Sequence, residues 1–586
     1  MILQSLCQYY DRLQQNVDVN IPEIGFSQEK ISFAIVIDKN GTMVGGKPQD
    51  IRETNEKGKL SPRMLFVPKV KGRAGINPPP YFLWDNAKYV LGGGEKILKE
   101  RDKDDKDDKY KLTEDRFLSF KEFVEGLFQN FNDEGAKAII QFLDNWKPEQ
   151  SLKLDNWEEI CKINFVFKLD TDYCFLHERK AIKQLWITYA KNELSTGHVG
   201  CCLISGGKAP IAQTHPLIKG IRGGKSTGGA IISFNIPSFV SYNKKQNFNS
   251  PISEVNAFKY TTALNHLCRF GSSQKIQIGD ATTVFWAKED NPMESIFGKI
   301  LSQSNDGFDQ EVKLFLESIQ NGRKPVYINE KTQFFILGLS PNAARISVRF
   351  WHVSNVEDVS QKLMLHFSDL KIEKKENDPE YPSIWHLLIE LVPSRKGEKR
   401  KTDAIPSNLA GQMIRAILNG SKYPESFYTT LISRIKTDHQ INYMRAAIIK
   451  AVLTRKYRFK NIKKEVSVAL DKENKNVSYL LGRLFSVLEK AQQDAIPGAN
   501  TTIRDRYYSS ASSTPKVVFP QLMRLANHHI SKAKYGYVSD KWIEEIVQDI
   551  KEFPAHLTLE EQGEFALGYY HQRNELFKKK EKKGEE

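Results

Sequence analysis

The sequence predicts an α+β protein, with a mixed α/β N-terminal region containing antiparallel strands and an all-α C-terminal helical bundle. Strand-like runs fall between Ile31 and Trp351, whereas the apolar residues beyond a basic linker at 395–401 have helical spacing. The 586 residues are enough for about three to four domains, and a hydrophobic content of 40% supports real cores. We expect three regions, with boundaries 1–115, 116–400 and 401–586.

Each element is justified by a local pattern. Apolar residues at helical spacing predict helices over 2–14 and 117–146. Runs rich in β-branched and aromatic residues predict strands at 31–38, 230–236, 282–286, 333–338 and 345–351. In the last strand Ile346, Val348 and Phe350 alternate with polar residues and are expected to face a core. Apolar stripes around Ile448, Leu484 and Leu522 predict helices of the C-terminal bundle.

The charge balance favours a polyanionic partner. The chain has 86 Lys or Arg and 71 Asp or Glu, a net charge of +15. The excess is uneven, because residues 57–84, 201–275 and 431–460 are rich in bases and contain almost no acids. A basic balance of this kind is typical of proteins that bind nucleic acid or an anionic membrane. Three acid-poor segments in one chain favour a nucleic acid.

Glycine-rich loops accompany two of these segments. Residues 220–229 read Gly-Ile-Arg-Gly-Gly-Lys-Ser-Thr-Gly-Gly, and residues 72–80 read Gly-Arg-Ala-Gly-Ile-Asn-Pro-Pro-Pro. Glycine backbone lets a sugar-phosphate chain come close, and flanking cations neutralise its phosphates. The proline-flanked loop is expected to be stiff and exposed.

The sequence favours a binding protein over a catalyst. Gly224-Lys225-Ser226 suggests a phosphate-binding P-loop, but the preceding glycine is one residue out of place and a β pattern, not a helix, follows. The six cysteines include no CxxC pair, so we expect reduced thiols and no metal site or cofactor. We expect no signal peptide and no membrane span, and therefore a cytoplasmic protein.

A series of short strings, in order over some 550 residues, resembles a known family. The strings are residues 25–27, 82–86, 210–220, 233–235, 260–267, 338–345, 481–485, 503–507 and 568–572. In this order they are similar to the large subunit of the type I-C CRISPR surveillance complex, Cascade (Csd-type family). The family often carries Gln where this chain has Lys225.

The resemblance implies a non-catalytic subunit in antiviral defence. Such a subunit recognises the flanking motif (PAM) in target duplex DNA, assists strand opening, stabilises the R-loop and recruits a separate helicase-nuclease. Its implied partners are target DNA, guide RNA, and the backbone and small subunits of Cascade. The family's C-terminal helical part is also made separately as a small subunit, and here an internal start is expected at about residue 466.

Two groups of residues are expected to contact DNA. Motif reading is assigned to the loop 69–77, with Asn77 at a base edge, and its members are Lys69, Lys71, Arg73, Gly75 and Asn77. Strand opening and backbone contact are assigned to basic residues elsewhere, namely Lys208, Lys219, Arg222, Lys225, Arg345, Arg349, Arg445, Lys450, Arg455, Lys456 and Arg458.

Two other functions stay open at this stage. An unrecognised DNA nuclease or helicase would need metal ligands or a nucleotide site that the sequence does not display. An RNA-binding scaffold would bind guide RNA more tightly than duplex DNA and would show no motif preference.

Overall fold

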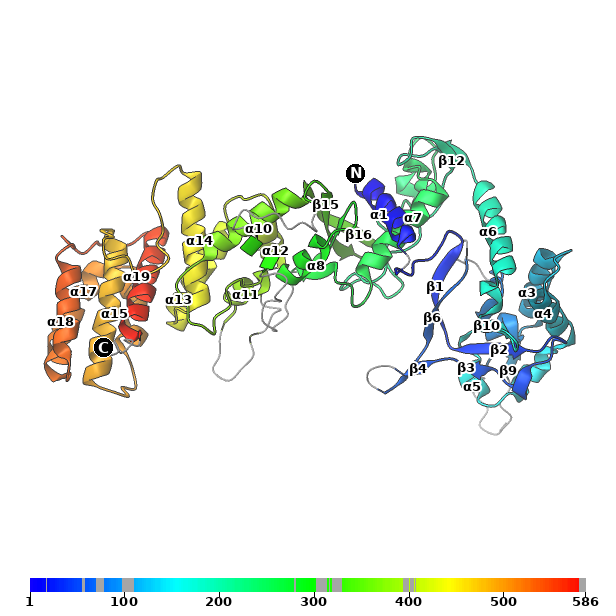
Figure 1. Ribbon diagram of the computed structural model, residues 1–586, viewed down its shortest axis with the longest axis horizontal. Coiled ribbons are helices and arrows are strands. Elements are labelled where there is room, and N and C mark those ends of the chain that lie inside the picture. The colour runs from blue at the N-terminus through cyan, green and yellow to red at the C-terminus, as the bar shows by residue number, and fades with distance from the viewer. Residues whose placement is uncertain are drawn as a thin grey trace, which may run out of the picture. The chain divides into compact units, whose positions relative to one another are not determined.

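The computed structural model describes residues 1–16, 18–54, 58–69, 78–96, 110–278, 281–301, 314–315, 317–318, 329–393, 400, 405 and 407–578. The chain forms two compact units (Figure 1). Unit 1 comprises Met1–Ile218 and Thr227–His266, and unit 2 comprises Lys219–Ser226 and Leu267–Glu586. The predicted α+β class is confirmed. The three-region division predicted from the sequence stays a prediction.

Unit 1 is built around a four-stranded mixed sheet. The strand order is β3-β2-β10-β7, with β2 parallel to β10 and the other two pairs antiparallel. The parallel pair lies at the centre because its residues are almost continuously apolar and buried. The strands of unit 1 are β1 (Phe26–Ile31), β2 (Phe33–Ile37), β3 (Gln49–Asp50), β4 (Glu53–Thr54), β5 (Leu60–Ser61), β6 (Arg63–Pro68), β7 (Trp84–Asn86), β8 (Gly93–Lys96), β9 (Tyr110–Leu112), β10 (Asn164–Leu169), β11 (Val199–Cys201) and β12 (Lys208–Pro210).

Helices complete the core of unit 1. They are α1 (Ile2–Gln15), α2 (Ala87–Val90), α3 (Glu114–Phe128), α4 (Glu134–Asn145), α5 (Trp157–Ile160), α6 (Lys180–Ser195) and α7 (Glu254–Cys268), whose last two residues belong to unit 2. The helix predicted over 2–14 is confirmed. The single helix expected over 117–146 is two, because Asn130 takes a positive φ of 62° and Asp133 caps the start of α4 by accepting from the amide of Ala136.

The strand expected at 230–236 is absent from the described backbone. Only an isolated antiparallel bridge, Ile218 to Gly229, forms beside it. The β-branched residues alone are therefore not sufficient, since this segment has no partner strand along its length. Residues 230–234 are half-buried, and Ile236 is exposed.

Unit 2 begins with an antiparallel meander of four strands, β13 (Lys275–Ile278), β14 (Ala281–Ala287), β15 (Gln333–Asn342) and β16 (Arg345–Asn355). The last three confirm predicted strands. The expectation that Val348 faces the core is wrong, since its side chain is 42% exposed. A β-bulge is responsible: Gly338 pairs with Phe350 and Leu339 with Val348, so Arg349 is an extra residue on β16 and the alternation is interrupted.

The remaining elements of unit 2 in the part of the chain that the structure describes are helices, and those beyond 401 confirm the predicted helical region. The helices are α8 (Met293–Leu301), α10 (Val356–Leu370), α11 (Ile384–Ile389), α12 (Ser407–Leu418), α13 (Glu425–Asp438), α14 (Tyr443–Phe459), α15 (Val477–Ala495), α16 (Ile503–Ala511), α17 (Pro515–Lys532), α18 (Gly536–Val547) and α19 (Leu559–Phe577). Asparagine caps begin α10, α14 and α15, and capping boxes begin α16 and α19. One continuous apolar core joins these helices to the sheet.

Helices α15 and α19 make the closest approach in the bundle, and Figure 1 shows them side by side with α17 and α18. Glycines permit it, because a Cβ on Gly482 would lie 1.9 Å from the carbonyl oxygen of Phe565. A Cβ on Gly568 would likewise lie 2.0 Å from the carbonyl oxygen of Tyr479. Two backbones therefore meet with no room for a methyl group.

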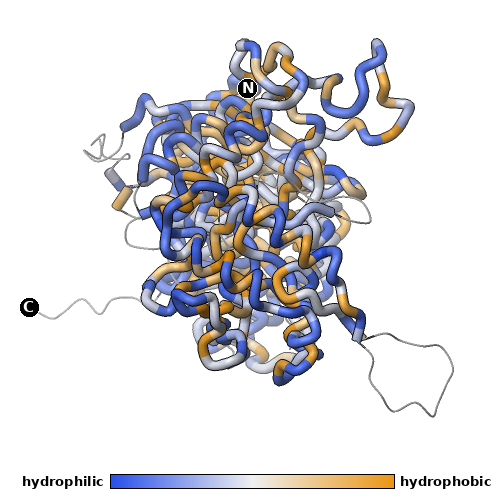
Figure 2. The backbone as a smooth tube through the Cα atoms, turned by 90° about the vertical axis from the view of Figure 1, so that its right-hand side faces the viewer, coloured by the Kyte–Doolittle hydropathy of each residue, from blue (hydrophilic) through white to orange (hydrophobic). Residues whose placement is uncertain are grey.

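Apolar and polar residues are interleaved along the backbone (Figure 2), as amphipathic elements with one buried face require. Among the described residues, no helix combines the length and the apolar character needed to cross a bilayer.

The glycine contact between α15 and α19 gives a stability prediction. We expect Gly568→Ala to lower the free energy of unfolding by about 1–3 kcal/mol, because the helices must separate to admit the methyl group. Gly411→Ala in α12 is the matched control, since a Cβ there meets no atom within 4 Å. The control should be neutral or stabilising by up to about 1 kcal/mol. Denaturant unfolding measures both, and equal losses would contradict the close packing.

Candidate nucleic-acid interface

A basic loop, Lys219–Ser226, lies against the sheet of unit 2. Gly220 takes a φ of +80°, and a Cβ on it would lie 2.2 Å from the carbonyl oxygen of Cys268, so only glycine fits. The amide of Arg222 donates to the Thr282 hydroxyl on β14 at 3.1 Å. Gly223 and Gly224 then pass beside Pro341 at the end of β15. The loop is therefore held against the sheet through its backbone.

The three cations of this loop point to solvent. Lys219, Arg222 and Lys225 are all exposed. Arg222 and Lys225 form no ion pair within the described residues. No Asp or Glu occurs in the sequence between Glu193 and Glu254, so the loop's own segment contributes no acid beside them. The positive charges of Arg222 and Lys225 are available to an external anion.

Two predicted cations on β16 join this loop. Pro341 pairs with Ile346 and Asn342 with Arg345, so Arg345 lies at the strand end beside which the loop passes. Arg349 is the extra residue of the bulge, and its Nε donates to the hydroxyl of Ser340 at 2.5 Å. Bulges commonly redirect a side chain near a functional site. We name the set Lys219, Arg222, Lys225, Arg345 and Arg349 the Pro341 cation surface.

An exposed aromatic side chain lies beside this surface. Phe270 follows α7 by two residues and is fully exposed, at 101% of its reference area. Lys275 Nζ closes the turn by donating to the carbonyls of Cys268 at 2.8 Å and Arg269 at 2.7 Å. Since Gly220 touches Cys268, Phe270 lies close to the cationic loop. Sequence reasoning missed Phe270, although the Arg269-Phe270-Gly271 turn after a helix was a usable signal.

Three predicted DNA-contacting residues lie inside the helical core, and this corrects the expectation for them. Arg445 and Arg455 are 0% exposed and Lys450 is 5% exposed. Arg445 Nε donates to Glu390 at 2.9 Å, and Arg455 Nε donates to Asp369 at 2.7 Å. Burial lowers the pKa of Lys450, whose Nζ donates to the Asp369 carbonyl at 3.1 Å. They were expected to line a path for separated strands, but Arg445 and Arg455 form buried ion pairs and Lys450 donates to a buried backbone carbonyl.

Two further C-terminal cations are also neutralised by the chain. Lys456 lies 2.8 Å from Glu425 and 3.4 Å from Glu560, with a side chain only 13% exposed. Arg458 Nη2 lies 2.6 Å from Asp369 Oδ1. Both therefore face acids of unit 2, and a phosphate would have to compete with those acids.

The predicted motif-reading loop falls mostly outside the described residues. Lys71, Arg73, Gly75 and Asn77 lie there, while Lys69 is described. Lys69 Nζ lies 2.6 Å from Glu29 Oε1 and 5.3 Å from the centre of the Tyr81 ring. On the described flanks, Trp84 Nε1 donates to the Pro68 carbonyl at 2.7 Å and the Tyr89 hydroxyl donates to the Pro78 carbonyl at 2.5 Å. Both ends of this loop are thus anchored to the core of unit 1.

Lys208 belongs to unit 1, apart from the Pro341 cation surface of unit 2. It begins β12, pairs in register with Cys201 of β11, and is exposed. The prediction that Lys208 acts together with Lys219, Arg222 and Lys225 stays a prediction.

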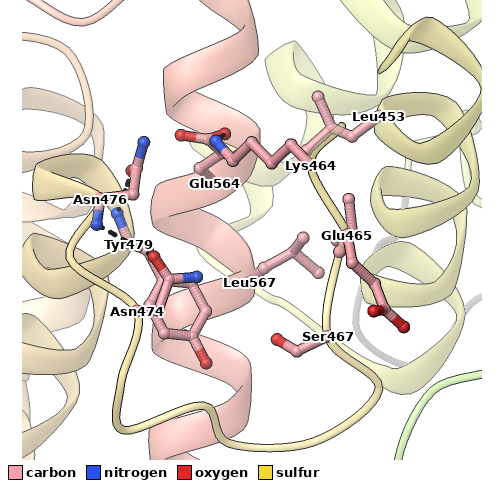
Figure 3. A pocket seen from close by; sticks show the side chains of 10 residues that line it. Leu453, Lys464, Glu465, Ser467, Asn474, Asn476, Tyr479, Glu564 and Leu567 are labelled. Atoms are coloured by element: carbon pink, nitrogen blue, oxygen red, sulfur yellow. Dashed lines mark hydrogen bonds and ion pairs between the residues drawn. The ribbon is translucent and has the colours of Figure 1, made fainter. Parts of the chain in front are cut away.

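A pocket in the helical part of unit 2 is a packing feature (Figure 3). The segment between α14 and α15 forms one wall, and α19 contributes Glu564 and Leu567. Lys464 reaches Glu564 in an ion pair, and the Asn476 side chain accepts from the amide of Tyr479 at 3.0 Å. Two of its three lining charges, Lys464 and Glu564, therefore neutralise each other. The internal start predicted near residue 466 falls on this wall and stays a prediction.

Histidines in the cores have structural partners. Tyrosine hydroxyls lie 2.7 Å from His215 Nδ1, 2.6 Å from His366 Nδ1 and 2.9 Å from His571 Nδ1. Burial lowers the pKa of His215 and His571 to about 4 and that of His366 to about 3. All three stay neutral near pH 7 and support packing. In the part of the chain that the structure describes, no three His, Cys, Asp or Glu residues gather as metal ligands do.

Comparison with known proteins agrees with the resemblance found in the sequence. A search of curated proteins finds no match. A family model described as CRISPR-associated protein (Cas_Csd1) matches residues 6–577, nearly the whole chain. The chain therefore belongs to the CRISPR-associated Csd1 family, and it is a Csd1-type large subunit of the Cascade complex.

Proposed function

We propose that this subunit recognises the flanking motif in target duplex DNA, assists strand opening and stabilises the R-loop, in antiviral defence. The observation that carries the proposal is the Pro341 cation surface, where five cations from a loop and a strand lie together without a balancing acid from the loop's own segment. Such a surface neutralises phosphates irrespective of sequence. Because the chain belongs to a Cascade family, target DNA is the polyanion that we expect this surface to bind.

Motif reading is assigned to the loop 69–77. Gly72 and Gly75 would let the backbone approach the duplex, and the Asn77 amide would bond to a base edge. Lys71 and Arg73 would set the register on phosphates. Anchoring of both described ends of this loop supports the assignment, because a reading element must be positioned reproducibly.

Strand opening is assigned to the Pro341 cation surface together with Phe270. Once a base pair opens, its bases need a new stacking partner, and an exposed phenyl ring can provide one. The cations of Arg222 and Lys225 would hold the adjacent phosphates. Sequence recognition beyond the motif belongs to guide RNA pairing, and cleavage to a separate helicase-nuclease that the subunit recruits.

An RNA-binding scaffold is the main alternative. The same cations would bind guide RNA, since phosphate contacts do not distinguish the two nucleic acids. Tighter binding of guide RNA than of duplex DNA, with no preference among flanking motifs, would favour the scaffold. DNA cleavage or unwinding by the purified chain with Mg²⁺ and ATP would favour the nuclease or helicase alternative.

Salt dependence tests the Pro341 cation surface. We expect the double variant Arg222→Gln, Lys225→Gln to weaken duplex binding by the full chain on every sequence. The slope of the logarithm of the association constant against the logarithm of salt concentration is negative, and its magnitude should decrease by about two, since each phosphate contact contributes about one unit. Titrations at several salt concentrations, followed by fluorescence anisotropy, measure it.

Lys475→Gln is the matched control for this experiment. Lys475 is 63% exposed but pairs with Asp549 at 2.6 Å, so its loss changes net charge without removing an available cation. The control should keep the slope within about half a unit of the unaltered chain. Equal slopes in the double variant and the unaltered chain would show that Arg222 and Lys225 do not contact phosphates, which would contradict the proposed role of the Pro341 cation surface.

Motif discrimination tests the assignment of Asn77. We expect Asn77→Ala to raise binding to non-preferred flanking motifs relative to the preferred one, with a change of about 1–3 kcal/mol in discrimination. Lys71→Gln should instead weaken all motifs about equally, because a phosphate contact carries no sequence information. Electrophoretic shifts on a motif library compare them. A uniform loss for Asn77→Ala would show that Asn77 is not the reading residue.

A further inference from the structure

A tight turn at Ser241–Lys244 of unit 1 holds a bulky residue in an unfavourable conformation. The amide of Lys244 donates to the Ser241 carbonyl at 2.9 Å, which closes a four-residue turn. Both central residues have positive φ, 49° at Tyr242 and 58° at Asn243, as in type I′ turns. Asn suits such a position, whereas a tyrosine there is a genuine outlier.

Packing does not explain the tyrosine. The Tyr242 side chain is 94% exposed, so burial of the ring offsets none of the backbone strain. Within a fold, strain of this kind persists where the surroundings impose it, and it concentrates at functional sites. The ring is therefore presented to a group outside the chain.

The base of the turn is held firmly. Asn249 Nδ2 donates to the carbonyls of Lys244 at 2.7 Å and Gln246 at 3.0 Å. Asn247 is buried, and the Phe248 ring meets His198 edge-on at 5.3 Å between centroids. Residues 246–249 form a 3₁₀ turn that fixes the direction of the chain. Tyr242 thus projects from an anchored support.

The surroundings of the ring are cationic. Lys244 and Lys245 follow it directly and are exposed. Neither forms an ion pair with any residue that the structure describes. The turn lies within the acid-free stretch between Glu193 and Glu254. An exposed ring beside available cations is the arrangement with which proteins hold unpaired nucleic acid, stacking on bases and neutralising phosphates.

We propose that Tyr242 is a stacking platform for an unpaired nucleobase, with Lys244 and Lys245 on the adjoining phosphates. This contact belongs to unit 1, whereas the Pro341 cation surface belongs to unit 2. It rests on the proposed function, because a displaced or opened strand supplies the unpaired base. Either DNA or RNA offers the same ring face, and comparison of the two oligonucleotides identifies the source.

Substitutions at position 242 separate stacking from folding. Tyr242→Asn places a residue that the turn favours and removes the ring, so thermal stability should be unchanged or higher. Its affinity for a single-stranded oligonucleotide should fall about five- to a hundredfold, the range of one lost base stack. Tyr242→Phe keeps the ring and should bind within about twofold of the unaltered chain.

Tyr173→Asn is the matched control. Tyr173 is as exposed, at 105%, and lies in unit 1, but its sequence neighbours are Asp170 and Asp172. Its substitution should leave binding unchanged. The probes are single strands of DNA and of RNA carrying 2-aminopurine, whose fluorescence is quenched on stacking. The quenching of 2-aminopurine fluorescence on binding should be lost with Tyr242→Asn and kept with Tyr242→Phe, Tyr173→Asn and the unaltered chain.

The outcomes distinguish this inference from the proposed function. The inference would be overturned if Tyr242→Asn left both the affinity for single strands and the fluorescence quenching unchanged. The proposed function would still hold if duplex binding continued to depend on Arg222 and Lys225. Loss of thermal stability in Tyr242→Asn would assign the ring a structural role and also overturn the inference. An unaltered chain that binds neither duplex nor single strand would overturn both.

Discussion

Buried ion pairs around Asp369 and Glu390 decide which cations of this chain remain at its surface. An isolated buried charge is very unfavourable, so Arg445 and Arg455 enter the helical core only with carboxylates beside them. Asp369 also contacts Arg458, and Glu425 and Glu560 face Lys456. Much of the positive charge of the C-terminal half is therefore used internally. The remaining basic surface lies where such acids are missing.

The Pro341 cation surface follows from backbone geometry more than from side-chain packing. Gly220 is the residue that lets the loop reach Cys268, and the bulge on β16 makes Arg349 the extra residue beside Ser340. The loop is anchored through its backbone, and Arg349 donates to the Ser340 hydroxyl. A surface assembled in this way leaves the charged groups of Arg222 and Lys225 for phosphates.

The fold class, the first helix and the strands of unit 2 were predictable because each depends on local periodicity. The errors have non-local causes. Val348 is exposed because of a bulge set by pairing with β15, and 230–236 is no strand because no partner lies along it. Arg455 seemed available because its acid, Asp369, lies 86 residues away in sequence, and Arg445 pairs with Glu390, 55 residues away, as well as with the nearby Asp438. The family strings were readable in order, whereas Tyr242 became visible only through its exposure and its backbone conformation.

Lysine footprinting tests the central claim most directly, that unpaired surface cations contact nucleic acid and internally paired ones do not. The full chain would be acetylated with and without target duplex, and each lysine read by mass spectrometry. The account predicts strong protection of Lys225, with Lys456, Lys460 and Lys475 unchanged. Protection confined to the paired lysines, with Lys225 still reactive, would contradict it.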